Sequence, residues 1–214
     1  MEIAKYKNIY YPKSNNSAVV NCLLKDRIWE SNLVKIFNTH VGKDDAVIDA
    51  GAYIGLHTFY LASLAKKVYS FEGQPLISEC VKKSLVELKI KNVIHKNIAL
   101  GDYIGDTYIH TNNDGDASLE GIRDHKFEDK YPVKVSTIDH LIKEKIKLIK
   151  IDVEGSEWEV INGAMNLIER DRPYIILETF KTKTNMTNLS AFALYIDYEI
   201  EYLKSDNYLL SPCL

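Results

Sequence analysis

The stretch AVIDAGAYIGLHT, residues 46–58, decides the fold of this 214-residue chain. Its apolar opening over residues 46–48 predicts a buried strand, which leads Asp49 and Gly51 into a tight turn. Apolar residues then recur at helical spacing over residues 54–66, so the turn connects a strand to a helix. A strand, a glycine turn and a helix in this order are typical of ligand-binding α/β proteins.

An acidic residue stands at the end of the next apolar run. Glu72 follows 21 residues after Gly51 and closes the strand predicted over residues 67–72. At this place a carboxylate can accept hydrogen bonds from both ribose hydroxyls of a nucleoside. The two features together predict a ligand that contains a nucleoside.

The glycine pattern distinguishes between nucleoside cofactors. Dinucleotide sites use G-x-G-x-x-G because a pyrophosphate needs closely approaching backbone N–H groups and the positive end of a helix. Here the turn reads GAYIG over residues 51–55, without the middle glycine and with a bulky Tyr-Ile pair. Asp49, just before the turn, would repel a pyrophosphate. A ligand with an amino group and no phosphate suits this turn, and S-adenosylmethionine fits that description.

The composition is that of an ordinary globular protein, with 46% hydrophobic and 27% charged residues, and its length suits a single domain. The net charge is −3, so the chain has no excess of basic side chains to neutralise phosphates, and we expect no nucleic-acid partner. Cys22, Cys80 and Cys213 form no C-x-x-C pair, which is typical of free thiols in a reducing compartment. The sequence has neither a signal-peptide core nor an apolar run of membrane length, so we expect a cytoplasmic protein.

Predicted strands and helices alternate from residue 41 onward, which indicates a parallel sheet with helices on both faces. We predict one α/β domain over residues 41–214, preceded by a cap segment over residues 1–40 that is packed on it. The cap holds a predicted strand at 9–11 and a helix at 31–38. In the domain, the predicted strands span residues 46–48, 67–72, 93–100, 133–135, 148–153, 174–177, 198–204 and 208–211, the last two as a hairpin. The predicted helices span 54–66 and 75–88, then one that opens at 136 or 137, one that ends at 168, and one near 189–195.

Residues 101–131 interrupt this alternation. They hold a short strand candidate at 107–111, followed by the polar stretch NNDGDASLEGIRDHKFEDK. Long irregular insertions in compact domains are usually functional or disordered. Because this one follows a strand at the edge where α/β sheets bind ligands, we predict an irregular segment with a functional role.

Five carboxylates stand at or just after the ends of predicted strands: Asp49, Glu72, Asp152, Glu154 and Glu178. The ends of parallel strands line one edge of a sheet, so we expect these side chains to gather there. Asp152 closes an otherwise apolar buried strand, LIKIDV, where an acid is costly without a partner. The pattern therefore favours a functional role for Asp152.

The chain resembles the FkbM family of S-adenosylmethionine-dependent methyltransferases in DAGAYIGLHT, FEGQP, NIALGD, STIDHL and KIDVEGSEWEVINGA, in this order and spacing. The resemblance extends to IYYP at 9–12, Trp29-Glu30 and NYL at 207–209. Two departures are Tyr53, where the family usually has Asn, and Gly73-Gln74, where it often has Pro-Asn. The resemblance implies a Rossmann-like class I methyltransferase fold, an α/β fold with a seven-stranded, mostly parallel sheet of order 3-2-1-4-5-7-6 whose last strand is antiparallel.

The resemblance also implies O-methyl transfer from S-adenosylmethionine to a small molecule or carbohydrate, and we expect a sugar hydroxyl of an oligosaccharide or glycoconjugate. Short polar side chains at Asn112, Asn113, Asp114, Asp116 and Ser118 suit a polyhydroxylated acceptor. In the first turn of its helix, His57 could hydrogen-bond the carboxylate of the cofactor. The expected cofactor contacts are Asp49, Gly51, Tyr53, Ile54, Gly55, His57, Thr58, Glu72, Gly73, Asn97, Ala99 and Asp152.

Methyl transfer to a hydroxyl needs a nearby base or a metal ion. The candidates for catalysis are Asp152, Glu154 and His125, and we expect Asp152 to serve turnover rather than folding. If a divalent cation such as Mg²⁺ takes part, Asp152 and Glu178 are its candidate ligands. The candidate acceptor-binding residues are Ser118, Trp158 and Glu178.

Other functions stay open at this point. The acceptor of an O-methyltransferase could be a small molecule that is not a sugar. A catalytically silent domain would keep Asp49 and Glu72 but lack a usable base, and the acids at 152 and 154 argue against it. An NAD-dependent oxidoreductase would need phosphate-binding glycines that the turn does not have.

Overall fold

The computed structural model describes residues 2–13, 17–111, 117–119 and 129–213. Seven of its strands form the central sheet, in the order β12-β13-β11-β10-β3-β4-β5. They span β3 Ala46–Ala50, β4 Lys67–Phe71, β5 Val93–Lys96, β10 Leu148–Ile151, β11 Tyr174–Glu178, β12 Tyr198–Lys204 and β13 Asn207–Pro212. The strands from β5 to β11 run parallel, whereas β13 runs antiparallel to both of its neighbours. This order confirms the predicted Rossmann-like class I methyltransferase fold.

The inner strands β3, β10 and β11 are buried on both faces, which explains why they read as nearly continuous apolar runs. Successive side chains alternate between two cores, so Ile48 and Ile149 face one core while Val47 and Leu148 face the other. The first core lies under α5 Ile138–Leu141, α6 Glu157–Asn162, α7 Met165–Asp171 and α8 Lys183–Ile196, and the second lies under α2 Ser31–His40 and α3 Leu56–Leu64.

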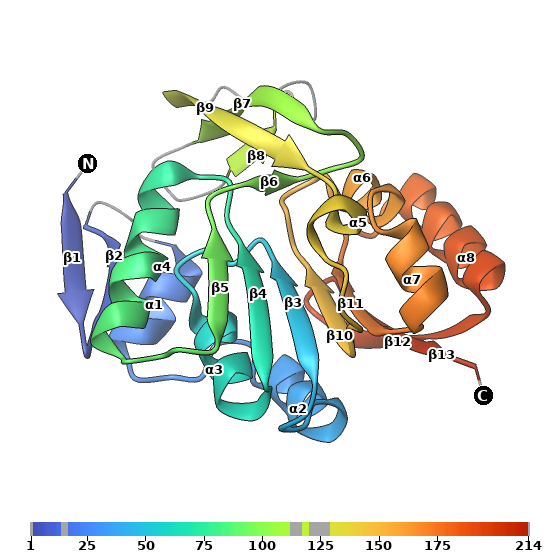
Figure 1. The fold of residues 1–214 in the computed structure, drawn as a ribbon, viewed down its shortest axis with the longest axis horizontal. Coiled ribbons are helices and arrows are strands. Elements are labelled where there is room, and N and C mark those ends of the chain that lie inside the picture. The colour runs from blue at the N-terminus through green and yellow to red at the C-terminus, as the bar shows by residue number, and fades with distance from the viewer. Residues whose placement is uncertain (1, 14–16, 112–116, 120–128, 214) are drawn as a thin grey trace.

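The first forty residues hold more structure than the sequence predicted. Besides the expected strand and helix, they contain β1 and the short helix α1, too brief for a clear periodicity. The hairpin of β1 and β2 lies beside α4 (Figure 1), and Tyr10 N donates to Ser84 Oγ of that helix at 2.8 Å. The division into a cap at 1–40 and a domain at 41–214 stays a prediction. The bounds are β1 Ile3–Tyr6, β2 Ile9–Pro12, α1 Ala18–Leu24 and α4 Pro75–Glu87.

A second sheet covers the carboxyl edge of the central sheet (Figure 1) and corrects two predictions. The strand predicted at 93–100 divides after Lys96, because the Asn97 side chain turns to bond the backbone after β4. The insertion at 101–131 is not irregular throughout, since several of its residues pair in this sheet. The order is β6-β9-β7-β8, with β6 Ala99–Leu100, β7 Gly105–Thr111, β8 Ala117–Leu119 and β9 Asp129–Ser136, which is longer than predicted.

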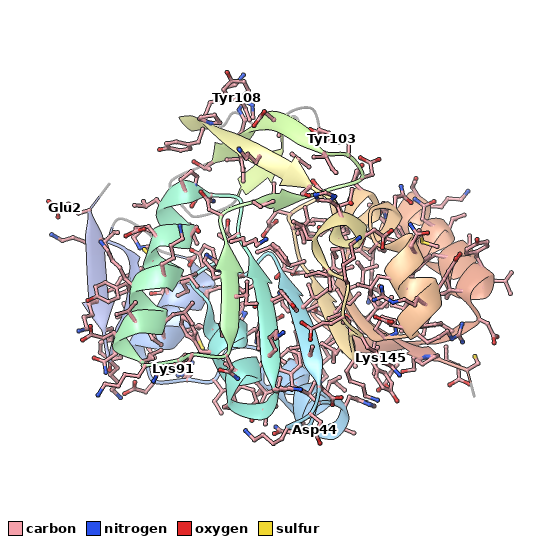
Figure 2. The ribbon with its side chains drawn as sticks, viewed as in Figure 1. Glu2, Asp44, Lys91, Tyr103, Tyr108 and Lys145 are labelled. Atoms are coloured by element: carbon pink, nitrogen blue, oxygen red, sulfur yellow. The ribbon has the colours of Figure 1, made fainter. Side chains whose placement is uncertain are left out.

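The two faces of the second sheet differ in character. Ile109 and Val133 turn inward and pack with Ala99 in a small apolar cluster. Tyr108 points away from the central sheet (Figure 2), is 43% exposed, and has Lys130 Nζ 4.0 Å from its ring centroid. The inner face therefore closes over the edge of the central sheet, while the outer face meets solvent.

Three helix predictions also need correction. The helix expected to end at 168 is two helices, because Asp139 bonds both the Gly163 carbonyl (from Asp139 N, 2.9 Å) and the Leu167 amide (to Asp139 Oδ1, 2.8 Å), which would otherwise pair with each other. The helix α3 begins two residues later than predicted because the turn, with positive φ at Tyr53, continues to Gly55. The helix α8 starts earlier than predicted, where Thr182 Oγ1 accepts a hydrogen bond from Asn185 N.

Candidate active site

A pocket lies at the carboxyl ends of β3, β4, β10 and β11, beneath the inner face of the second sheet. Open α/β sheets bind ligands at this edge, where the strand order reverses between β3 and β10. Of the residues predicted from the sequence, those on its wall are Gly51, Tyr53, Ile54, His57, Glu72, Gly73, Ala99, Asp152, Glu154 and Glu178. Within the described part of the chain, five other predicted residues do not line the pocket: Asp49, Gly55, Thr58, Asn97 and Trp158.

The glycine turn joins the two halves of the pocket. Gly51 has a φ of +82°, and a Cβ there would lie 1.6 Å from the carbonyl oxygen of Asp152. No other residue fits, because both the backbone conformation and the space exclude a side chain. The N–H groups of Gly51 and Ala52 donate to the Phe71 carbonyl at 3.0 and 2.9 Å. The turn is thereby fixed between the end of β4 on one side and the end of β10 on the other.

Main-chain amides hold Glu72 at one end of the pocket. Its Oε2 accepts from Tyr53 N at 2.8 Å and its Oε1 accepts from Gln74 N at 2.7 Å. The residue is 8% exposed. Burial, opposed by these two hydrogen bonds, raises the pKa of Glu72 to about 7, with a smaller contribution from the charges of Asp49 and Asp152. Each oxygen keeps a free lone pair, so the carboxylate can still accept hydrogen bonds from a ligand.

An apolar wall stands beside Glu72. It is built from Ile77 of α4, Ile98 and Ala99 before and in β6, and Ile109 of β7. Asn97 supports this wall from outside, because its Nδ2 donates to the carbonyls of Glu72 and Gly73, each at 2.8 Å. Asn97 therefore positions the backbone of the site rather than lining it.

A buried lysine organises the other end of the pocket. Lys150 is 2% exposed, and its Nζ donates to Asp152 Oδ2 at 2.8 Å and lies 3.9 Å from Asp49 Oδ1. Burial disfavours a charged ammonium, but Asp152 and Asp49 hold the pKa of Lys150 above its usual range. The strand LIKIDV thus carries an ion pair on one side, with Lys150 and Asp152 two residues apart.

Asp152 and Glu178 form an acid pair above this lysine. Burial, the charge of Asp152 and a hydrogen bond to it raise the pKa of Glu178 to about 10, so Glu178 is protonated at neutral pH and donates to Asp152. Burial opposes ionisation of Asp152, but the charge of Lys150 and the hydrogen bonds from Glu178 and Lys150 hold the pKa of Asp152 below its usual range. The Asp152 side chain is 25% exposed, so an ionised carboxylate faces the pocket.

Asp49 lies beneath the pocket rather than in it. The residue is fully buried, and its Oδ2 accepts from Thr58 Oγ1 at 2.5 Å. Its Oδ1 has no hydrogen-bond partner among the described residues. Asp49 therefore lies behind the pocket wall, close to Lys150, and its contact with a cofactor stays a prediction.

His57 lies on the wall but is engaged by another residue. Its Nε2 lies 2.9 Å from Glu30 Oε2, and the two side chains are 8% and 12% exposed. The ring of Phe37 packs edge-on against the imidazole, with 5.4 Å between ring centroids. Its Nε2 thus bonds to a residue of the N-terminal segment, and a contact of His57 with a cofactor carboxylate stays a prediction.

Two of the remaining predicted site residues lie in different surroundings, Trp158 in the first core and Tyr53 on the pocket wall. Trp158 packs edge-on against Phe192 in the first core, with 6.2 Å between ring centroids. Tyr53 donates its hydroxyl to Ser17 Oγ at 2.9 Å. Ser118 lies in β8, opposite His110 in register. His125 and the polar residues at 112, 113, 114 and 116 lie outside the described residues.

The described residues contain no group of three or more His, Cys, Asp or Glu side chains placed to hold a metal ion. At Asp152 and Glu178, the expected ligands, the two carboxyl groups bond each other and Lys150 supplies the positive charge. The expected Mg²⁺ therefore has no support from this part of the chain.

Three functional candidates were missed by sequence reasoning. Lys150 could have been found, because a lysine in an apolar strand two residues before an acid predicts a buried ion pair. Ser156 also lines the pocket, with a buried hydroxyl that has no partner among the described residues. Glu30 was noted only in the Trp29-Glu30 match to the family, and its role was missed because its partners lie far away in the sequence.

Comparisons with known proteins agree with this architecture. The family model described as the methyltransferase FkbM domain matches residues 49–209 of this sequence. The hexuronic acid methyltransferase AglP of Haloferax volcanii is 24% identical over 157 residues, which cover 68% of this chain and 61% of that protein. This chain thus spans less than two thirds of the length of this relative.

Two solved structures share the fold. The methyltransferase FkbM from Methylobacillus flagellatus KT superposes with a TM-score of 0.60 at 17% identity, over 90% of this chain and 52% of that one. A candidate methyltransferase from Streptococcus mutans, in complex with SAH, gives a TM-score of 0.56 at 16% identity, over 84% of this chain and 94% of that one. No helix in the described part of our chain is long and apolar enough to span a bilayer. The match over residues 49–209, together with the fold, places this chain in the FkbM family of methyltransferases.

Proposed function

We propose that this protein is an S-adenosylmethionine-dependent O-methyltransferase that acts on a sugar hydroxyl of an oligosaccharide or glycoconjugate. The observation that carries the proposal is one pocket with two different acidic ends. Glu72 lies at one end, where its two oxygens are oriented by backbone amides. Asp152 lies at the other, ionised and partly exposed. The first end suits a ribose and the second suits a hydroxyl that must lose a proton.

The residues at the Glu72 end fit an adenosine. The carboxylate offers acceptors to the two ribose hydroxyls, and the wall of Ile77, Ile98 and Ile109 offers an apolar surface to the base. The turn before α3 presents Tyr53 where a dinucleotide site needs its middle glycine, which disfavours NAD. S-adenosylmethionine, when bound, supplies an activated methyl group on a positively charged sulfur.

At the other end, Asp152 is the candidate general base. Lys150 and Glu178 both donate to it, so its carboxylate is fixed in orientation before an acceptor arrives. Asp152 can accept the proton of a bound hydroxyl because it is ionised at neutral pH. The hydroxyl of Ser156, which has no partner in the part of the chain that the structure describes, is a candidate hydrogen-bond partner for the acceptor.

A sugar acceptor is supported by the relative AglP, which is a hexuronic acid methyltransferase. The chain adds its own support through the polar composition of residues 112–118, whose short Asn, Asp and Ser side chains suit many hydroxyl groups. The net charge of −3 disfavours nucleic acid as the acceptor, because phosphates need neutralising cations.

A transfer assay tests the proposal. S-adenosylmethionine with an isotopically labelled methyl group is incubated with the chain and a panel of free sugars, glycosides, hexuronic acids, phenols and RNA. We expect label in at least one sugar or glycoside, with no transfer when the acceptor is omitted. Transfer to phenols or RNA and to no sugar would contradict the sugar assignment. Binding of the cofactor without transfer to any acceptor class would favour the catalytically silent alternative.

A further inference from the structure

We propose that Glu30, from the N-terminal segment, binds the α-ammonium group of the amino-acid tail of S-adenosylmethionine. This inference rests on the proposed function and adds an ammonium subsite to it. The residue lies on the pocket wall next to Trp29, outside the strand–turn–helix unit that carries the other cofactor contacts. The segment before α2 would thus take part in cofactor binding.

Two distant parts of the chain hold the Glu30 carboxylate in place. Its Oε2 lies 2.9 Å from His57 Nε2, in the first turn of α3. Its Oε1 accepts from Asn207 Nδ2, at the start of β13, at 3.0 Å. Asn207 is 1% exposed, and the Glu30 side chain is 12% exposed. Such burial of a charged group is costly unless the group has partners, which these contacts supply.

The backbone of Glu30 is also in an uncommon conformation. Glu30 is the N-cap of α2 with φ 42° and ψ 60°, in the left-handed region, and its side chain makes no capping hydrogen bond. An acid at this place would ordinarily face solvent or cap the helix. Here the carboxylate lies on the pocket wall instead and bonds to His57 and Asn207.

The position of Glu30 matches the far end of a bound cofactor. Asn207, which holds it, pairs in register with Glu178 at the end of β11. Glu72 lies on the opposite side of the β3 turn, at the end of β4. An adenosine bound at Glu72 would extend its tail across the turn toward β10 and β11, where Glu30 lies.

The chemistry of the Glu30 carboxylate suits an ammonium group. A carboxylate has about four lone-pair sites on its two oxygens, and the protein donors His57 and Asn207 occupy two of them. Lys150, the buried cation nearby, is already engaged by Asp152. Glu30 therefore keeps acceptor capacity for a cationic donor, and an ammonium has three N–H groups to offer.

Titration calorimetry with S-adenosylhomocysteine and its deaminated analogue, in which hydrogen replaces the α-amino group, tests this subsite. We expect the unaltered chain to bind S-adenosylhomocysteine at least about tenfold more tightly than the analogue, as a charge-assisted hydrogen bond implies. Glu30→Gln keeps the size of the side chain and removes its charge. This variant is expected to bind both ligands alike, at the affinity that the unaltered chain shows for the analogue.

The controls separate binding from folding. Glu199→Gln, an exposed substitution of the same kind in β12, is expected to keep the preference. The inference is overturned if Glu30→Gln keeps the preference for S-adenosylhomocysteine over the analogue. It is also overturned if this variant lowers the affinity for both ligands by the same factor, as loss of a purely structural contact would. If this variant does not fold, a crystal structure of the unaltered chain with S-adenosylhomocysteine decides. We expect the α-nitrogen of the ligand within hydrogen-bond distance of Glu30, and a location elsewhere would overturn the inference. No binding of S-adenosylhomocysteine to the unaltered chain would contradict the proposed function itself.

Discussion

The two acidic ends of the pocket are held in different ways. Backbone amides of Tyr53 and Gln74 orient Glu72, and both belong to the loops next to it. Asp152 is oriented by the side chains of Lys150 and Glu178, which bring their own charge and protonation. A carboxylate held by the backbone tolerates substitutions around it, because the amides remain. A carboxylate held by side chains depends on every member of its network. We therefore expect single substitutions to be more damaging at the Asp152 end.

The largest expected effect follows loss of the buried cation. Lys150→Met removes the positive charge between Asp49 and Asp152 and leaves two carboxylates in a buried site. Breaking a buried pair in this way typically costs about 3–5 kcal/mol. We expect the free energy of unfolding, measured by urea denaturation, to fall by this amount. Lys145→Met is the matched control, since Lys145 is exposed and lies at the opposite edge of the sheet (Figure 2). Equal stability of Lys150→Met and the control would show that the network is not structural.

The next effect concerns turnover. Asp152→Asn keeps the shape of the side chain but cannot take a proton, so methyl transfer should fall by about a hundredfold or more. The same change weakens the contact with Lys150, and we expect a loss of about 1–3 kcal/mol in unfolding free energy. The structure thus modifies the sequence-based expectation that Asp152 serves turnover alone. Asp102→Asn, an exposed change in the loop after β6, is the control. Full transfer by Asp152→Asn would assign the base elsewhere.

A smaller effect is expected from pH at the Glu72 end. Because the pKa of Glu72 is raised to about 7, the carboxylate becomes fully ionised only above neutrality. The ionised form accepts ribose hydroxyls better, so affinity for S-adenosylhomocysteine should rise by up to about tenfold from about pH 6 to about pH 8. Glu72→Gln should bind weakly and lose this dependence on pH. A pH dependence that survives in Glu72→Gln would assign it to another group.

The same shift has a consequence for stability. Glu72 binds its proton more tightly in the folded chain, where its pKa is about 7, than at its ordinary value of 4.5. Stability contributed by the protonated form is therefore lost as the pH rises from about 4.5 to about 7, and no further change is expected above that range. Comparison of Glu72→Gln with the unaltered chain across these pH values measures the contribution.

The same contrast explains what could be predicted from the sequence. The Glu72 end follows from local patterns, because an apolar strand, a glycine turn and an acid at the end of the next strand determine where Glu72 lies. The order of the central sheet followed from the alternation of elements together with the family resemblance. The second sheet did not, since β7 and β9 are distant in sequence and pair across a polar stretch.

Long-range contacts also explain the site residues that were missed or misplaced. Asp49 was expected to contact the ligand, yet Thr58 and Lys150 enclose it beneath the pocket. Glu30 contacts His57 and Asn207 only after the chain has folded, and the spacing of residues in the sequence does not predict these contacts. Side-chain partners between distant elements are the part of a site that sequence patterns do not encode.

The central claim, that the pocket binds the cofactor through Glu72, is tested most directly by titration calorimetry of S-adenosylhomocysteine into the unaltered chain and into Glu72→Ala. The substitution removes acceptors for two ribose hydroxyls, each worth about 1.5–3 kcal/mol. We expect specific binding to the unaltered chain and a dissociation constant at least about tenfold higher for Glu72→Ala. The same dissociation constant for both proteins would contradict it.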